Sequence, residues 1–118
     1  MTIDEFKQQL LADENAISFN DVMNLIATNY DYTPTAFHNG LGNDSLLNEA
    51  GTNEGSCKLF SFALKQGFDK QQTLACFGDY YRQDVLRNPD GSDHQNIRNF
   101  IKYGWEGIRF EGDALRNL

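Results

Sequence analysis

The chain has 118 residues, an apolar content of 40% and a formal net charge of −7. A chain of this length suits one domain that buries roughly two-thirds of the surface exposed by its unfolded form. No apolar run approaches the ~18 residues that a membrane span needs, and the first residues lack the basic start and apolar stretch of a secretory signal. These features argue against a membrane protein and predict a cytoplasmic one.

The charge is distributed unevenly. Residues 1–55 carry nine acids and one base, which gives −8, whereas residues 56–118 carry eight acids and nine bases. An acidic chain without runs of Lys or Arg lacks the basic surface that binds a phosphate backbone, so no nucleic-acid partner is expected. The simplest role for the excess acid is a solvated face that keeps the protein soluble.

The first 30 residues predict two helices. Thr2 and Glu5 match the capping-box pattern, and apolar residues then recur at helical spacing. Ser18 and Asp21 repeat the capping pattern ahead of a second apolar face. The predicted helices cover residues 3–13 and 19–30.

A β-hairpin is predicted next. Pro34 blocks further helix and favours an extended chain before it. Residues 35–38 and 46–49 are short enough for strands, and the segment 39–45 between them is rich in turn-forming Asn, Gly, Asp and Ser. Residues 51–55 predict a further loop.

Two more helices follow the hairpin. Ser56 can cap the third helix, and Gly67 can end it in a left-handed conformation. Asp69 with Gln72 caps a fourth, longer helix that Pro89 must end.

The turn 89–91, Pro-Asp-Gly, leads into the last predicted elements. Ser92 or Asp93 can cap a fifth helix that ends at Gly104, and residues 107–110 alternate as a strand does. The sequence therefore predicts an α+β fold in a single domain, residues 1–118. About five helices pack with a small antiparallel sheet of short strands.

One polar cluster is the leading candidate site. Asp84 and Arg82 lie near the end of the predicted fourth helix, and Asp93, His94 and Arg98 open the fifth. A carboxylate beside an imidazole can serve acid–base chemistry, and guanidinium groups can bind an anion. The structural interpretation, preferred on sequence grounds, is that Asp93 caps a helix and the arginines pair with Asp84. Both interpretations place these residues at one helical corner.

Asn96 and Glu49 complete the candidate binding residues. Asn96 has no evident structural role on the fifth helix, and Glu49 opens a Gly-containing loop at 48–56 whose backbone could approach a ligand. Gly55-Ser56 at a helix start suits an anion, but no phosphate-binding or dinucleotide motif accompanies it. A loop that caps the third helix is the simpler interpretation.

The cysteines and histidines do not predict a cofactor or metal site. Cys57 at a helix start can have a lowered thiol pKa, but it shares a face with apolar residues and is expected to be buried and inert, as is Cys76. His38 and His94 are too far from each other and from the cysteines for zinc-site spacing. We expect no cofactor, no metal and two reduced thiols.

The segments TLACFGDYYRQDVL, NPDGSDHQNIRNFI and GWEGIRFEG resemble the signature of the HopJ type III effector family. Upstream, NYDYTPTAFHNG and NEAGTNEGSCKLFSFA are similar to its N-terminal half, so the resemblance covers residues 19–115. The family brings no established catalytic residues, substrate or cofactor. Its name implies type III secretion as an alternative to the cytoplasm.

Three hypotheses for function follow. The first is a small non-catalytic binding domain that contacts an unidentified protein or small molecule through the corner at 84–98, with no membrane partner, as a monomer or weak homodimer. The second is an uncharacterised enzyme that uses His94 with Asp84 or Asp93 for acid–base chemistry. The third is a housekeeping structural protein of the cytosol that is never secreted.

Overall fold

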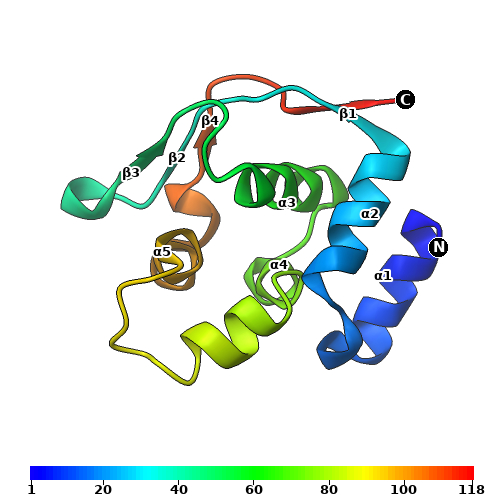
Figure 1. Cartoon of the computed structure of the whole chain (residues 1–118), viewed down its shortest axis with the longest axis horizontal. Coiled ribbons are helices and arrows are strands. Elements are labelled where there is room, and N and C mark those ends of the chain that lie inside the picture. The colour runs from blue at the N-terminus through cyan, green and yellow to red at the C-terminus, as the bar shows by residue number, and fades with distance from the viewer.

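The chain folds mainly into helices joined by short strands, which confirms the predicted α+β class. The computed structural model describes residues 1–118 (Figure 1). The helical elements are α1 (Ile3–Ala12), α2 (Phe19–Asn29), α3 (Glu54–Gln66), α4 (Lys70–Ala75), the π-helical segment η3 (Tyr80–Val85) and α5 (Gln95–Tyr103). The strands are β1 (Tyr30–Tyr32), β2 (Phe37–Asn39), β3 (Leu46–Asn48), β4 (Arg109–Phe110) and β5 (Leu115–Asn117).

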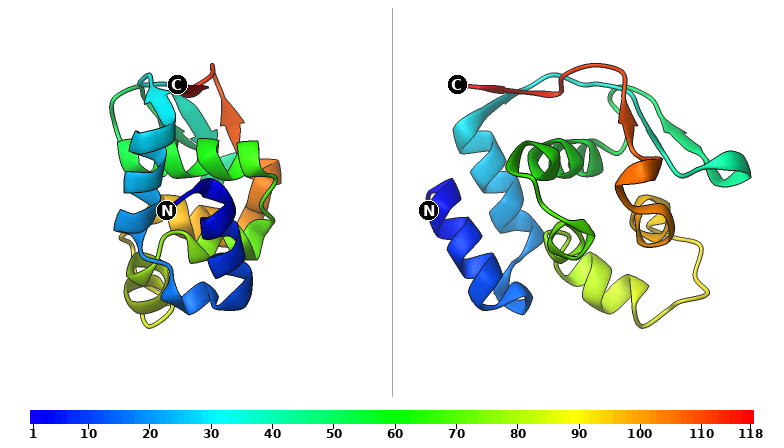
Figure 2. Two further views of the ribbon diagram at one scale, coloured as in Figure 1. Left: turned by 90° about the vertical axis from the view of Figure 1, so that its right-hand side faces the viewer. Right: turned by 180° about the vertical axis from the view of Figure 1, so that it is seen from behind.

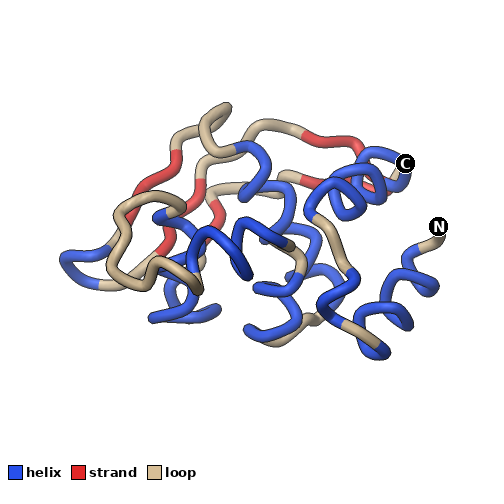
Figure 3. Tube along the Cα trace, turned by 60° about the horizontal axis from the view of Figure 1, so that its bottom comes forward, coloured by secondary structure: helices blue, strands red, loops and turns tan.

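The strands lie along one side of the helices. In Figures 1 and 2, α3 runs directly beneath the strands, α1 and α2 stand together at one end, and α4, η3 and α5 lie on the far side of α3. Figure 3 separates the strands into a group near α5 and a pair near the C-terminus. No helix is long and apolar enough to cross a bilayer.

The strands form two small antiparallel sheets. The predicted hairpin is present as β2 and β3, with Phe37 opposite Asn48. The predicted strand at 107–110 shortens to β4, which pairs with the other edge of β2. The pair β1–β5, with Tyr32 opposite Leu115, was not expected from the sequence.

Aromatic rings from four elements and one turn meet at Phe60 of α3. Its ring centroid lies 5.9 Å from Phe37, 5.4 Å from Phe77, 5.0 Å from Phe100 and 6.2 Å from Trp105. Burial of each such ring stabilises the fold by about 1.5–3 kcal/mol. One contiguous cluster of 23 buried apolar residues therefore joins the helices to the strands.

Three of the predicted helix starts are confirmed. Thr2 and Asp69 each form a complete capping box with the Glu or Gln three residues later. The Ser18 hydroxyl accepts the Asp21 N–H at 3.1 Å. Each cap satisfies a backbone donor that would otherwise lack a partner, and is worth about 1 kcal/mol.

Two predicted helix starts are wrong. α3 begins two residues before Ser56, after Asn53 in the left-handed conformation (φ 48°), and no side chain caps it. α5 begins after His94, also left-handed (φ 49°), so neither Ser92 nor Asp93 caps it. In both cases an αL residue turns the chain sharply into the helix, which leaves the preceding side chains free for other contacts.

The predicted long fourth helix is in fact broken. α4 ends at Ala75, and Gly78 adopts a left-handed conformation (φ +61°) before the chain resumes as η3. A Cβ at Gly78 would lie 2.9 Å from the backbone nitrogen of Phe19. The close approach of the α2 start therefore requires glycine here, and the apolar stripe in the sequence concealed the break.

The ends of the other helices follow the sequence. Gly67 is left-handed (φ +72°) and ends α3, and Gly104 (φ +61°) ends α5. Trp105 then folds back onto the core, and its ring N–H donates to the Phe68 carbonyl at 2.9 Å, as expected for a partly buried indole.

Candidate functional site

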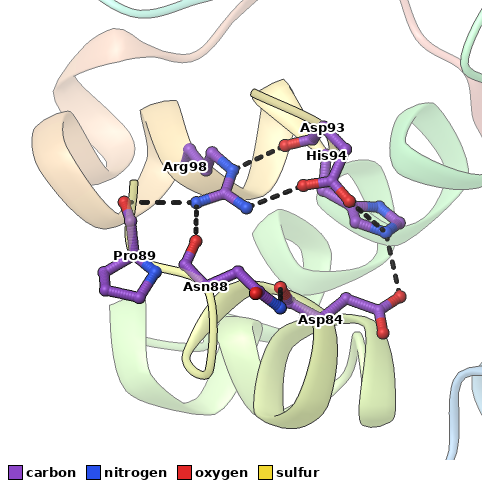
Figure 4. Close-up of polar contacts among 6 residues, drawn as sticks. All are labelled: Asp84, Asn88, Pro89, Asp93, His94 and Arg98. Carbon is purple, nitrogen blue, oxygen red and sulfur yellow. Dashed lines mark hydrogen bonds and ion pairs between the residues drawn. The ribbon is translucent and has the colours of Figure 1, made fainter. Parts of the chain in front are cut away.

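The chain reverses between η3 and α5, and polar side chains meet there (Figure 4). We call residues 84–98 the η3–α5 corner. His94 Nε2 lies 3.0 Å from Asp84 Oδ2 and 4.0 Å from Asp93 Oδ2. The His94 side chain is 29% exposed and that of Asp84 is 48% exposed. The imidazole is therefore held between two carboxylates at the surface rather than in the core.

Arg98 fixes the loop that precedes it. Its Nε donates to the Asp93 carbonyl at 2.6 Å, and its Nη2 donates to Asp93 Oδ1 at 2.7 Å. Nη1 donates to the carbonyls of Asn88 at 2.8 Å and Pro89 at 3.4 Å (Figure 4). One guanidinium thus satisfies three backbone carbonyls and one carboxylate, which positions the loop that carries His94.

This pairing has an electrostatic consequence for Asp93. The hydrogen bond from Arg98 holds the pKa of Asp93 below its ordinary value, and the positive charge of Arg98 adds to the effect. Asp93 is therefore ionised at neutral pH. Its role is to hold Arg98, not to cap α5 as the sequence suggested.

The backbone at His94 stores strain. A non-glycine residue in the left-handed region is uncommon, and the conformation costs on the order of 1 kcal/mol. It turns the imidazole toward Tyr80, whose ring centroid lies 5.3 Å away. Strain at a surface side chain held by two carboxylates is a common mark of a functional position.

A groove adjoins the corner. It has a volume of about 410 Å³ and lies between the start of α2 and the π-helical segment η3. Its walls include the ring of Tyr80, which meets Phe19 edge-on at 5.2 Å and also contacts His94. The groove is lined by Ser18, Phe19, Asn20, Phe77, Asp79, Tyr80, Arg82 and Asp84.

Arg82 does not pair with Asp84 as the sequence predicted, but points toward the chain before α2. Its guanidinium donates to the Ile17 carbonyl at 2.7 Å and to the Glu14 carbonyl at 3.3 Å, and lies 3.8 Å from Asp79. The structure shows no ion pair between Asp84 and Arg82 or Arg98; Asp84 contacts His94 instead. Arg82 therefore ties the chain before α2 to η3 and forms part of the groove wall.

Asn96 belongs to a separate, buried cluster. Its amide exchanges hydrogen bonds with that of Asn48 at 2.8 and 3.1 Å, and Asn39 donates to its side chain at 3.0 Å and to its carbonyl at 2.8 Å. Asn99 donates to the backbone carbonyls of Asn39 and Asp44, both at 3.0 Å. We call Asn39, Asn48, Asn96 and Asn99 the buried asparagine network. It joins the β2–β3 hairpin to α5.

Glu49 lies away from the corner. Its side chain is exposed, and its carbonyl accepts from the Thr52 N–H at 3.0 Å and hydroxyl at 2.6 Å. The Gly55-Ser56 pair lies within the first turn of α3. The loop enters α3 through the left-handed Asn53, and no side chain of the loop caps the helix, contrary to the simpler interpretation.

Both thiols are buried, and neither forms a disulfide; Cys57 Sγ donates to the Thr35 carbonyl at 3.4 Å. Cys57 and Cys76 are both free, and they are 1% and 0% exposed. Burial raises the pKa of both thiols, to about 12 for Cys76. Neither thiol is an activated nucleophile, because activation requires a lowered pKa.

The remaining histidine pairs elsewhere. His38 Nε2 lies 2.7 Å from Glu111 Oε1, which links β2 to the residue after β4. No three His, Cys, Asp or Glu side chains come together in an arrangement that could hold a metal ion.

Sequence reasoning missed the aromatic wall of the groove. The apolar face of the predicted second helix contains Phe19, which therefore read as a core position, and Tyr80 lies off the apolar stripe of the predicted fourth helix and had no assigned role. Asp79 lies beside the break at Gly78. The only signal was Gly78 itself, since a glycine within a helical pattern often marks a break or a close approach. Taking that break into account would have turned Tyr80 and Asp79 toward the α2 start.

Comparison with known proteins places the chain in a family. The family model described as HopJ type III effector protein matches residues 3–115. A search of curated proteins found no match. Among solved structures, a crystal structure of the unknown function protein VPA0580 is similar, with 49% sequence identity and a TM-score of 0.94 over 100% of this chain and 95% of that one. The chain therefore belongs to the HopJ type III effector family.

Proposed function

We propose that this chain is a small non-catalytic binding domain whose contact surface is the groove together with the η3–α5 corner. The observation that carries the proposal is the coincidence of two unusual backbone features at one place. The π-helical segment η3 supplies Tyr80, Arg82 and Asp84 to the groove, and the left-handed His94 adjoins them. π-helical turns and strained residues both concentrate at functional sites.

The exposure of the side chains supports a binding role. The Tyr80 side chain is 45% exposed. The two rings that it contacts, Phe19 and His94, are less exposed. A large aromatic ring that lines an open groove beside charged groups is the composition typical of binding hot spots. The surface is thus suited to a partner that covers Tyr80.

The thiol chemistry also favours binding over covalent catalysis. Burial raises the pKa of Cys57 and Cys76, and the ion-pair partners of His94 are the carboxylates of Asp84 and Asp93. Covalent catalysis by a Ser, Thr or Cys nucleophile requires its hydroxyl or thiol within reach of the base.

A thermal-shift screen of metabolites and peptides tests the proposal. Compounds that raise the melting temperature of the native protein should lose this effect in Tyr80→Ala, which removes the groove wall. Leu47→Ala is the matched control, because Leu47 is 51% exposed on β3, outside the groove. Hits that stabilise the native protein and Tyr80→Ala equally would place the binding surface elsewhere.

A second candidate function is acid–base catalysis by His94. The specific observation is the 3.0 Å contact with Asp84 in a partly exposed position beside the groove. A carboxylate that accepts the Nε2–H fixes the tautomer in which Nδ1 can take a proton from a substrate. In this mechanism Asp84 orients and stabilises the imidazolium, and Asp93 adds a second negative charge.

Measuring turnover distinguishes the binding domain from the enzyme. Ligands from the screen are incubated with the native protein and with His94→Ala, and products are followed by mass spectrometry. Binding without turnover supports the binding domain. Turnover that disappears in His94→Ala while binding persists supports the enzyme.

We further propose that the domain works in the cytoplasm of the cell that makes it. Two free, buried thiols fit a reducing compartment, where disulfides are rare. The family name raises type III export as the alternative. Fusion of the first thirty residues to a reporter in a secreting host tests this: the reporter should stay in the cell, and its export would contradict the cytoplasmic assignment.

A further inference from the structure

We propose that the group bound in the groove is the guanidinium or ammonium of an Arg or Lys side chain, presented by a basic segment of a partner protein. This inference rests on the proposed binding function, and it names the chemistry of the partner. It draws on the charge of the groove, on its aromatic wall and on an apolar hollow lined by the residues that follow Asp84 in the chain.

The exposed charge of the groove is negative. Its lining contains two carboxylates: Asp79 is 80% exposed, and Asp84 offers Oδ1, which makes no hydrogen bond within the chain. The single cation in the lining, Arg82, is only 18% exposed and already donates to two backbone carbonyls. Arg82 reaches Asp79 only at 3.8 Å, and His94 contacts only the Oδ2 of Asp84. Each carboxylate therefore keeps one oxygen that a cationic group in the groove can approach, whereas an anionic group meets repulsion.

The aromatic wall suits the same class of ligand. His94 contacts both the exposed Tyr80 ring and the Asp84 carboxylate, so the ring and the carboxylate lie near each other. A ring face attracts a cation through its quadrupole, and a guanidinium also stacks on it. The aliphatic stem of an Arg or Lys side chain can cover Phe19 while its charged end reaches a carboxylate.

An apolar hollow lined by the residues that follow Asp84 in the chain indicates a protein segment rather than a free amine. Asp84 lines the groove, and the next two residues, Val85 and Leu86, line a hollow of about 230 Å³ together with Pro89, Arg98 and Ile101. Leu86 is 52% exposed there. A free amine would leave this hollow empty, whereas a basic segment that also carries an apolar residue would fill both depressions.

The acidity of the N-terminal half supports the same choice. Residues 1–55, which include the α2 side of the groove, carry −8. Excess charge of one sign in this half of the chain accelerates the approach of a partner of the opposite sign. The association should therefore weaken as salt is added, because salt screens exposed charges.

Selection from a random dodecapeptide display library tests the inference with the whole native protein as the target. Selected peptides should be enriched in Arg or Lys near Leu, Ile or Phe. The affinity of a selected synthetic peptide should fall about tenfold in Asp79→Asn/Asp84→Asn. The control Asp4→Asn/Asp31→Asn removes the same charge at two exposed acids outside the groove and should lose much less affinity.

A second variant guards against a folding defect. Asp84→Asn alters the contact with His94, whereas Asp79 makes only a 3.8 Å contact with Arg82, so Asp79→Lys leaves the corner intact and should still weaken the peptide. Circular dichroism and amide NMR spectra of each variant establish that the fold is retained.

The outcomes distinguish this inference from the proposed function. Peptides that perturb the groove residues in NMR spectra but carry no basic enrichment would overturn the cationic partner and leave the binding domain standing. Peptides that map elsewhere, or no enrichment over a blank surface, would overturn both. Spermidine or arginine methyl ester that binds the groove as tightly as the peptides would overturn the assignment to a partner protein.

Discussion

Helix α5 carries two polar clusters that differ in almost every physical respect. The buried asparagine network uses neutral amides, of which Asn39 and Asn48 are 0% and 1% exposed, and it connects residues 48 to 60 positions apart in the chain. The η3–α5 corner uses charged groups that are partly exposed and lie within 10 positions of each other. The first cluster holds distant segments together, and the second shapes a local surface.

The difference shows that burial decides whether a polar group serves the fold or is free to bind a ligand. A buried amide that loses its partner costs about 1–3 kcal/mol, so most groups of the network are committed to one another, with the Asn39 Oδ1 as a buried exception. Exposed ions at the corner can exchange a protein partner for water or for a ligand at little cost. We therefore expect mutations in the network to lower stability most, and mutations at the corner to have smaller effects on stability and to change binding.

The largest effect is expected for Asn96→Ala. The change removes the amide that pairs with Asn48 and accepts from Asn39, which leaves both partners buried without those hydrogen bonds. The free energy of unfolding should fall by about 3 kcal/mol, measured by urea denaturation. Asn43→Ala, at an exposed residue with no side-chain hydrogen bond, should change it by less than about 0.5 kcal/mol. Equal losses would show that the network does not carry the hairpin.

Arg98→Lys should have an intermediate effect that is local. A lysine cannot reach the carbonyls of Asn88 and Asp93 and the Asp93 carboxylate together, so the loop at 88–93 should open. The unfolding free energy should fall by about 1–2 kcal/mol, and amides of the loop should exchange faster with deuterium. Arg87→Lys, at an exposed residue, is the control. Unchanged exchange in the loop would mean that the backbone alone fixes it.

His94 allows the backbone strain to be separated from the side-chain contact. Both His94→Ala and His94→Gly remove the contact with Asp84, but only glycine adopts φ near +49° without strain. The glycine variant should be more stable than the alanine variant by about 1 kcal/mol in urea denaturation. Identical stabilities of the two variants would show that the left-handed turn stores no strain.

The smallest effect is expected on the stability of the protein at low pH. Hydrogen bonds from Arg98, and from Lys102 with Tyr103, hold the pKa values of Asp93 and Asp44 below the ordinary value of 3.8. Because the folded pKa is lowered, the stabilisation is complete above the ordinary pKa and is lost as pH falls through the lower folded pKa. Native protein should lose more stability below pH 3.8 than Arg98→Lys/Lys102→Met does. Parallel pH profiles would contradict this assignment.

Local signals predicted much of the fold. The capping residues Thr2, Ser18 and Asp69 and the stop at Gly67 act within one helical turn, so their chemistry is visible in a short stretch of sequence. The non-local features were harder to predict. The β1–β5 pair joins three-residue strands from opposite ends of the chain, and no periodicity marks strands of that length.

The candidate site was predicted only in part for the same reason. The proximity of Asp84 and His94 followed from a helix, a turn and another helix, and the structure places them 3.0 Å apart. Arg82 and Asn96, which the sequence placed in the same cluster, point to the α2 start and to the hairpin. Those partners lie 48 or more positions away, beyond the range of helical spacing arguments.

The burial of both native thiols leaves the surface without a reactive sulfur. A cysteine introduced at Asn20, an exposed residue in the groove lining, would then be the single site for maleimide labelling. An environment-sensitive fluorophore attached there would report occupancy of the groove directly in solution. The packing of Cys57 and Cys76 in the core thus makes the domain suitable for use as its own optical sensor.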